Sequence, residues 1–381
     1  MKILILVCLI LFAVMAETRG QFTCSTNADD TLTITGYTGP AGAVVIPTNI
    51  NGLTVSGIGE LAFGTDLPFH PSTSLTSITI PGSVTSIGTE AFAECAGLTN
   101  VTLANGLVSI EDEAFYDCTG LSNVTIPSSV TNLGEVVFEA CTRLTSIQIP
   151  ASIPNIGIQT FEGCDSLTNV VLTNGLGNID QFAFQGSAFT SIAIPDTVTN
   201  IGYGAFSSCG NLTSVTIPPT VASIGDETFY DCQSLTNAII ASGVSNIAYE
   251  MFDTCTNLTS VFFQGNAPSV VGDGYYGLVF DDDSKAVAYY LPGKTGWSNT
   301  YWYIPAVEWN PAMPPATMHN GQFGVTVTGN TNIPIQLQAC TNLNSPAWMP
   351  LTNVSLTDGS FYYSEPVQSN SPSRFYRVVF P

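Results

Sequence analysis

Hydrophobic residues recur with a fixed period in the middle of this chain. The segment LTSITIPGSVTSIGTEAFAEC at Leu75 returns as LTNVTLANGLVSIEDEAFYDC at Leu98 and as LSNVTIPSSVTNLGEVVFEAC at Leu121. The period is 23 residues, and one residue is missing in the coil that contains Ser187 and Phe189. A repeat of this length indicates a stack of similar coils. Nine coils start at Leu75, Leu98, Leu121, Leu144, Leu167, Phe189, Leu212, Leu235 and Leu258.

The pattern inside one unit predicts a strand followed by a tight return. Ile78 and Ile80 flank an outward Thr79, which is the alternation of a half-buried strand. Pro81 closes this strand because proline lacks the N–H that would continue a ladder. Ala91 and Phe92 have helical spacing, with room for about one turn. A unit this short cannot cover its own apolar face, so the coils must stack and share one core.

Both ends of the repeat are irregular and are expected to act as caps. Thr31 to Thr35 alternates as a strand in the front segment, residues 21–74. The regular coils span residues 75–263, and residues 264–310 form the rear cap. Val287 to Leu291 reads as a strand there, and the aromatic side chains that follow it are expected to seal the last coil: Trp297, Tyr301, Trp302, Tyr303 and Trp309.

A separate module is expected over residues 311–381. It begins with the proline-rich boundary PAMPP, and short alternating runs separated by turn residues predict a small all-β sandwich. The runs are Phe323 to Val327, Ile335 to Ala339, Phe361 to Tyr363 and Phe375 to Phe380.

The first twenty residues have the features of an export signal. Lys2 precedes an apolar run from Ile3 to Ala16, and small residues follow at Ala16 and Gly20. The run is shorter than the roughly 20 residues that cross a bilayer. We therefore expect a secreted or cell-surface protein without a membrane span.

The repeat unit LxxIxIPxxVxxIGxxAFxxC resembles the BspA-like class of leucine-rich repeats, which occur in bacterial surface and secreted proteins. The resemblance covers roughly Val44 to Phe263. It implies a right-handed, curved solenoid with a parallel sheet on one side, and a role in adhesion or protein binding. The class has no shared catalytic residue and no single shared ligand. The ending SRFYRVVFP resembles C-terminal modules of large exported proteins from environmental bacteria, for which attachment, sorting and sugar binding all stay open.

Charge narrows the choice of partners. The chain has seven Lys and Arg against 29 Asp and Glu, a formal net charge of −22. Nucleic acid is therefore an implausible partner, because its binding rests on clustered basic residues. Docking onto an anionic membrane is disfavoured for the same reason.

The cysteines form one column of the repeat, with Ser187 in the gap. Stacked coils place them about 5 Å apart, which is within reach of a disulfide. Parallel side chains suit bridging poorly, and a line of ligands suits a tetrahedral metal site poorly, so we expect buried thiols and no metal. The column is Cys95, Cys118, Cys141, Cys164, Cys209, Cys232 and Cys255.

Motifs for catalysis or cofactor binding find little support. GDGYYG at residues 272–277 matches a dinucleotide pattern, but neither the helix nor the distant acidic residue that such a site requires follows it. The run Asp281 to Asp283 could hold calcium, although a solvated turn is the simpler interpretation. His70 and His319 stand apart from any hydrolase motif, and the carboxylates near Glu111 recur from coil to coil. We expect a chain that is not an enzyme and uses no cofactor.

The outward strand positions are the candidate ligand face. Their column becomes apolar near the rear cap, where a protein partner is expected to dock. The column comprises Thr79, Thr102, Thr125, Gln148, Val171, Ala193, Thr216, Ile239 and Phe262.

An alternative is polysaccharide binding by exposed aromatic rings. The candidate rings are Trp297, Trp302, Trp348 and Tyr362. Ice binding by the threonine columns is a third and weaker alternative, because the columns are mixed. The partner is thus expected to be an extracellular protein or a polysaccharide.

Overall fold

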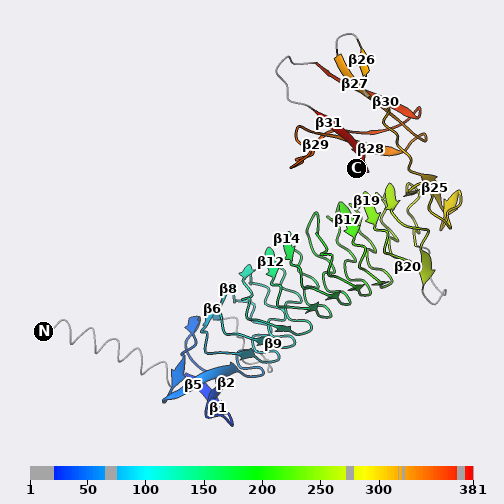
Figure 1. Cartoon of the computed structure of the whole chain (residues 1–381). Helices are drawn as coiled ribbons and strands as arrows, with labels where there is room; N and C mark the ends of the chain where they lie inside the picture. Colours follow the sequence, from blue (N-terminus) through cyan, green and yellow to red (C-terminus); the bar gives the residue numbers. More distant parts are fainter. Residues whose placement is uncertain are drawn as a thin grey trace.

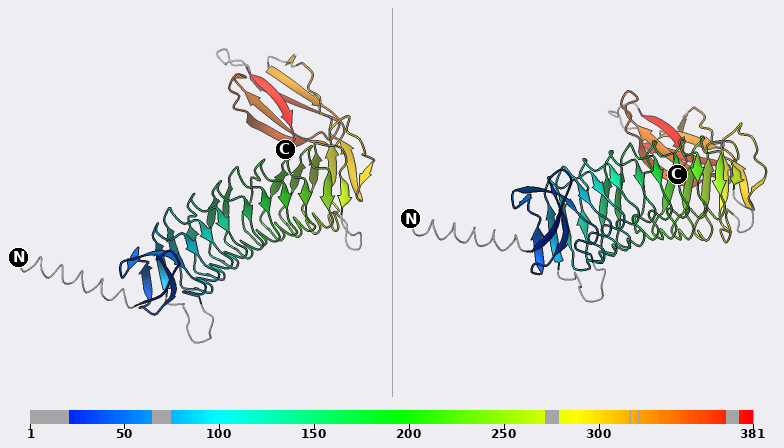
Figure 2. Two further views of the ribbon diagram at one scale, coloured as in Figure 1. Left: turned by 60° about the horizontal axis from the view of Figure 1, so that its bottom comes forward. Right: turned by 90° about the horizontal axis from the view of Figure 1, so that it is seen from below.

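The computed structural model describes residues 21–64, 75–271, 279–315, 317–319, 322–366 and 374–380. They form an elongated stack of coils with a smaller body of antiparallel strands at its C-terminal end (Figures 1 and 2). The predicted solenoid of parallel strands with a small all-β body after it is confirmed. Among these residues, no helix has the length and apolar character needed to cross a membrane.

Each regular coil except one contributes a longer strand to one side of the stack. Most of these strands pair in parallel with a shift of one repeat, so that Ile78 lies opposite Val101, although β10 and β12 form no ladder with each other. Inward residues such as Ile78 and Ile80 are fully buried, as the alternation predicts. The longer strands are β3 (Gly42–Val45), β6 (Leu75–Ile80), β8 (Asn100–Leu103), β10 (Asn123–Val124), β12 (Ser146–Ile149), β14 (Asn169–Leu172), β17 (Ser214–Ile217), β19 (Asn237–Ile240), β21 (Ser260–Phe263), β23 (Val287–Tyr290) and β25 (Ile304–Glu308).

The coil with the missing residue interrupts this ladder. Between β14 and β17, Ser191 makes only an isolated bridge to Ser214. Phe189 takes the position of the usual leucine, and its ring meets the rings of Phe184 and Phe206 edge-on. The coil that lacks one residue therefore forms no long strand, but Phe189 still fills the core at this position.

A second parallel ladder of short strands, which the sequence pattern did not reveal, runs along another side. It is built from residues such as Ile87 and Ile110, which are fully buried. These strands are β5 (Leu53–Ile58), β7 (Ser86–Ile87), β9 (Ser109–Ile110), β11 (Asn132–Leu133), β13 (Asn155–Ile156), β15 (Asn178–Ile179), β16 (Asn200–Ile201), β18 (Ser223–Ile224), β20 (Asn246–Ala248) and β22 (Ser269–Val271).

The third side consists of turns, and the helical turn expected near Ala91 and Phe92 is wrong. Glu90 and Glu94 have positive φ values of 54° and 58°. These left-handed residues turn alternate N–H groups toward the next coil, so that Phe92 N donates to Ala114 O at 2.9 Å. In a helix, these N–H groups would bond to carbonyls of the same coil. Neighbouring coils would then have no backbone hydrogen bonds on this side.

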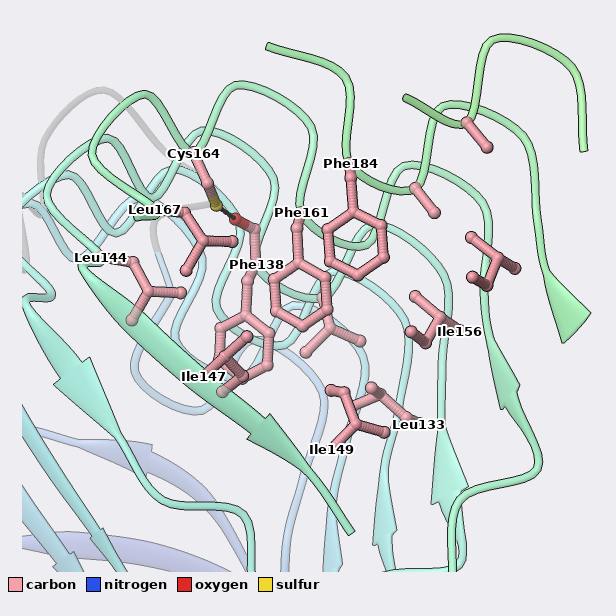
Figure 3. Close-up of a cluster of buried hydrophobic side chains, with 14 of the residues drawn as sticks. Leu133, Phe138, Leu144, Ile147, Ile149, Ile156, Phe161, Cys164, Leu167 and Phe184 are labelled. Carbon is pink, nitrogen blue, oxygen red and sulfur yellow. Dashed lines mark hydrogen bonds between the residues drawn. The ribbon is translucent and has the colours of Figure 1, made fainter. Parts of the chain in front are cut away.

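A column of phenylalanine rings runs through the core. Phe138 and Phe161 stack with their centroids 5.6 Å apart and an angle of 7° between the ring planes. Figure 3 shows this stack continuing to Phe184, with Cys164 and leucine and isoleucine side chains packed around it. Offset stacking adds to the apolar area that each ring buries. The stack comprises Phe63, Phe92, Phe115, Phe138, Phe161, Phe184, Phe206, Phe229, Phe252 and Phe280.

The front cap covers the open end of this core with antiparallel strands. The strand expected at Thr31 to Thr35 is present as β2 (Leu32–Tyr37), between β1 (Phe22–Thr26) and β5. A short strand β4 (Asn49–Ile50) pairs with β5. The ring of Tyr37 stacks on Phe63 at 5.4 Å and thus continues the phenylalanine column into the cap.

At the other end, β23 confirms the strand expected near Val287. A hairpin of β24 (Thr300–Tyr301) and β25 closes the long-strand sheet. Trp297, Tyr301 and Trp302 pack against the core as expected, whereas the side chain of Tyr303 is 78% exposed.

The C-terminal body, called the module from here on, has two three-stranded antiparallel sheets. One contains β26 (Thr317–His319), β27 (Gln322–Thr328) and β30 (Ser360–Pro366), and the other contains β29 (Met349–Ser355), β28 (Pro334–Cys340) and β31 (Phe375–Val379). The four predicted runs lie in β27, β28, β30 and β31. Val325, Val327 and Leu337 form part of the module core.

Candidate binding surface

The outward positions of the long strands form one aligned column, here called the strand face. Register pairs Thr79 with Thr102 and Gln148 with Val171. Val45 of β3, which sequence reasoning missed, extends the column at the front, where its side chain is 66% exposed. Strand register places Val45, Thr79, Thr102, Gln148, Val171, Thr216, Ile239 and Phe262 on the strand face. Thr125 and Ala193 occupy the equivalent positions of the repeat, outside the named strands, and are counted with it.

A threonine ladder along the edge of the strand face ties the coils together. Thr99 Oγ1 donates to Thr76 O at 3.0 Å, and Thr236 Oγ1 donates to Thr213 O at the same distance. Because the acceptor always belongs to the preceding coil, these hydroxyls hold the spacing of the face. A partner would therefore meet a surface that is already ordered and loses little conformational entropy on binding.

The strand face is uncharged, and carboxylates stand in columns on the turn side. Burial raises the pKa of Glu139, and the neighbouring Glu162 and Glu113 raise it further. At the rear, burial together with Asp281 raises the pKa of Asp253 to about 6. Like charges stacked one coil apart repel each other, which disfavours ionisation of Glu139 and Asp253. The acidic residues that recur from coil to coil in the sequence thus form rows of carboxylates along the turn side of the stack.

The rear end of the strand face is covered by the module, which corrects the expectation of an exposed apolar patch. The side chain of Phe262 is only 4% exposed, and its ring stacks on Phe380 with a centroid distance of 4.3 Å. Trp309 packs edge-on against Phe262 at 5.1 Å and donates from Nε1 to Pro334 O. Ile239 packs against the same cluster. Figures 1 and 2 show the module folded back over this end.

The junction also leaves an open cleft of about 470 Å³. Tyr289 of the stack lies in its wall, and its hydroxyl donates to Asn332 O of the module at 3.3 Å. The lining residues are Val287, Tyr289, Pro305, Val307, Asn330, Thr331 and Asn332.

The column of cysteines lies in the core, on the turn side of the phenylalanine stack. The nine cysteines of the described residues are thiols. Cys164 Sγ donates to Phe138 O of the preceding coil at 3.3 Å, and Cys118 Sγ donates to Phe92 O at 3.2 Å. The pKa of Cys141 lies well above its usual value because the thiol is buried. The Oγ of Ser187, which fills the gap in the column, is buried and has no hydrogen-bond partner.

Asp283 ends the same column. It lies three residues after Phe280, as Cys255 lies three residues after Phe252, and Phe280 stacks on Phe252 at 5.7 Å. The side chain is 2% exposed, and neither carboxyl oxygen has a hydrogen-bond partner. Burial, with a smaller contribution from neighbouring aspartates, raises its pKa to about 8. Within the described residues, no three acidic, cysteine or histidine side chains are arranged to hold a metal ion.

The four aromatic residues considered for sugar stacking lie in different surroundings. Trp297 stacks on Tyr290 of the cap at 4.8 Å, and Trp302 meets Tyr249 of the regular coils edge-on, so both rings already have aromatic partners. In the module, Tyr362 is 45% exposed and Trp348 is half-buried.

Three sequence motifs lie outside the described residues: the export signal at 1–20, His70, and the glycine-rich segment at 272–277. His319 lies in β26.

Comparison with known proteins places these features in a family. The family model described as the BspA type leucine rich repeat region matches six copies, over residues 68–189 and 177–273. No curated protein matches the chain.

Solved structures of bacterial repeat proteins are similar to parts of the chain. A leucine rich cell surface protein from Faecalibacterium prausnitzii is 26% identical, with a TM-score of 0.49, and the match covers 72% of this chain and 88% of that one. A leucine-rich repeat protein from Bacteroides ovatus is 22% identical with a TM-score of 0.43, over 71% and 83% of the two chains. The pneumococcal vaccine antigen PcpA is 17% identical with a TM-score of 0.39, over 71% and 92%.

Proposed function

Because this chain belongs to the family of BspA-type leucine-rich-repeat proteins, we propose that it is an exported scaffold whose strand face binds an extracellular protein. It acts by holding its partner and not by catalysis. The export signal expected at residues 1–20 and the cell-surface description of the Faecalibacterium protein support the location.

The observation that carries this proposal is the docking of the module on the strand face. Phe262, at the rear of the column, already holds a folded β-domain through Phe380, and Trp309 of the rear cap packs beside it and donates to Pro334 O of the module. The module covers only the rear end of the strand face. The rest of the strand face continues toward the front cap and is uncovered. Thr102, Thr125 and Gln148 are exposed there.

The chemistry of the uncovered part suits a protein more than a charged polymer. Its hydroxyl and amide groups are interrupted by the side chains of Val45 and Val171, which are 66% and 43% exposed. Mixed polar and apolar area is typical of protein interfaces that form and dissociate. Neutral groups also cost less to desolvate than charges, so shape can decide the fit.

Two sets of variants test this proposal in a screen against immobilised extracellular proteins. Thr102→Lys with Thr125→Lys places two long charged side chains in the middle of the strand face. Val108→Lys is the matched control, because Val108 is 45% exposed and lies outside the strand face, just before β9. We expect the double variant to lose a captured ligand at least about tenfold and the control to retain it. Equal loss in both, or loss in neither, would refute the assignment.

A further inference from the structure

The outer side of the sheet β29–β28–β31 carries a row of hydrogen-bonded polar side chains. Arg377 Nε donates to Gln338 Oε1 at 2.8 Å, and Gln338 Nε2 donates to Gln336 Oε1. Gln336 Nε2 then donates to Asn353 Oδ1 at 3.0 Å. All donors point the same way, so every amide is held in one orientation. We call these four residues the amide row. Their neighbours in β28 face the module core, namely Ile335, Leu337 and Ala339.

An aromatic ring adjoins the row at Arg377. The guanidinium carbon of Arg377 lies 4.4 Å from the centroid of the Trp348 ring. This cation–π contact fixes the plane of the guanidinium as well as the ring. The site therefore combines a flat apolar platform with donors and acceptors that are held in place.

Arg377 has donors to spare and lacks a carboxylate partner. Within the part of the chain that the structure describes, the ion pair of the module joins Arg374 to Glu365, and no carboxylate lies within salt-bridge distance of Arg377. With Nε engaged by Gln338, the terminal nitrogens can form a paired contact with a carboxylate.

The charge of the chain is distributed so that an anion can approach this sheet. Residues 311–381 contain Asp358, Glu365, Arg374 and Arg377 as their charged side chains, so their formal charges cancel. The whole net charge of −22 therefore lies on residues 1–310. At physiological salt, the field of the acidic columns falls off over about 8 Å. The module is thus the part of this acidic protein where an anionic ligand meets least repulsion.

We propose that this sheet face binds an acidic polysaccharide. A sugar carboxylate pairs with Arg377, the apolar side of the sugar ring lies against Trp348, and hydroxyl groups bond to the amide row. This site is separate from the strand face, and the proposal goes beyond the proposed function. The module can bind a polysaccharide whether or not the strand face binds a protein.

Titration calorimetry of the full chain with two polymers tests this inference. Polygalacturonate supplies the carboxylates, and its fully methyl-esterified form is the matched polymer without charge. We expect binding of the first, with at least about tenfold weaker binding of the ester. Arg377→Gln should weaken polygalacturonate binding by a similar factor. Arg143→Gln, which removes the same charge from an exposed position on the stack, should leave it unchanged.

A second pair of variants covers the case in which Arg377→Gln unfolds the module. Asn353→Ala changes an exposed end of the row and should weaken binding about threefold without a change in Tm. Arg377→Lys keeps the charge but loses the paired geometry, so its affinity should fall between those of the wild type and Arg377→Gln. Equal affinity for the two polymers, absence of binding to polygalacturonate, or wild-type affinity in folded Arg377→Gln would each overturn the proposal.

Discussion

Phe380, one residue from the end of the chain, stacks on Phe262 of the last regular coil with an angle of 9° between the rings. This contact joins the module to the repeat stack through one shared apolar cluster, which also includes Tyr289 and Trp309. The position of the module over the strand face therefore depends on a few aromatic side chains and not only on the connection near Pro311.

Phe380→Ala is expected to release the module from the stack without unfolding either part. Truncating a buried phenylalanine costs roughly 3–5 kcal/mol, and the half-buried Phe380 should cost somewhat less. Small-angle scattering should show a larger radius of gyration, and protease should cut faster near Pro311 to Pro315. Tyr362→Ala, at an exposed ring of the same module, is the control and should change neither.

A double-mutant cycle separates this contact from general damage. If the rings stabilise each other, Phe262→Ala combined with Phe380→Ala should cost clearly less than the two single changes added together. Additive effects would show that the stacking contributes nothing of its own.

Much of this architecture follows from the repeat, because each 23-residue unit carries its own inward and outward positions around Thr79. The short ladder did not show in the sequence, since two-residue strands such as Ser86–Ile87 are too short to alternate. The turn at Glu90 could not be predicted, because a positive φ is usually marked by glycine in the sequence. Here hydrogen bonds between coils stabilise it at a glutamate instead. The burial of Phe262 depends on a residue 118 positions later, which no local pattern reveals.

The binding candidates of the module show the same limit. The sequence pattern singled out Trp348 as a ring but gave no sign of Arg377 above it. Register between β28 and β31 places Gln338 beside Arg377 and so brings the two together. Arg377 could have been noticed in the sequence, because the module contains so few charged residues.

Asp283 is expected to make the chain less stable as pH rises. Its pKa is raised to about 8 in the folded state, mainly by burial, whereas an unfolded aspartate titrates near 4. Between those values the folded state retains a proton that the unfolded chain has lost. The free energy of unfolding should therefore fall by up to about 1.4 kcal/mol per pH unit from about pH 4 to about pH 8.

Urea unfolding at a series of pH values checks this slope. The groups that act on Asp283 from the adjoining turns are Asp253, Asp281, Asp282 and Cys255. Asp283→Asn removes the titration but keeps the shape, so its stability should depend much less on pH. An unchanged slope in this variant would show that another group is responsible.

Ser187 should be a site where a single substitution stabilises the stack. Its buried hydroxyl has no partner, whereas thiols at the equivalent positions donate to a carbonyl of the preceding coil. The longer side chain in Ser187→Cys should restore that bond and add about 0.5–1.5 kcal/mol. Ser187→Ala, which only removes the unpaired group, should stabilise less. A lower Tm in both variants would contradict this account of the column.

The thiols of the cysteine column should be inert in the folded chain. Burial raises the pKa of Cys209 and Cys232, and the reactive form of cysteine is the thiolate. With Ellman's reagent at neutral pH, Cys24, which is partly exposed in the front cap, should react first. The column should react only after denaturant is added, and rapid reaction of several buried thiols would indicate that the coils open locally.

The most direct test of the central claim is hydrogen–deuterium exchange on the chain with and without a captured protein ligand. Binding at the strand face should slow exchange in β8, β10 and β12, while the turns around Glu113 and Glu139 exchange as before. Protection confined to the turns or to the module, with β8 to β12 unchanged, would show that the repeat presents its partner on a different side.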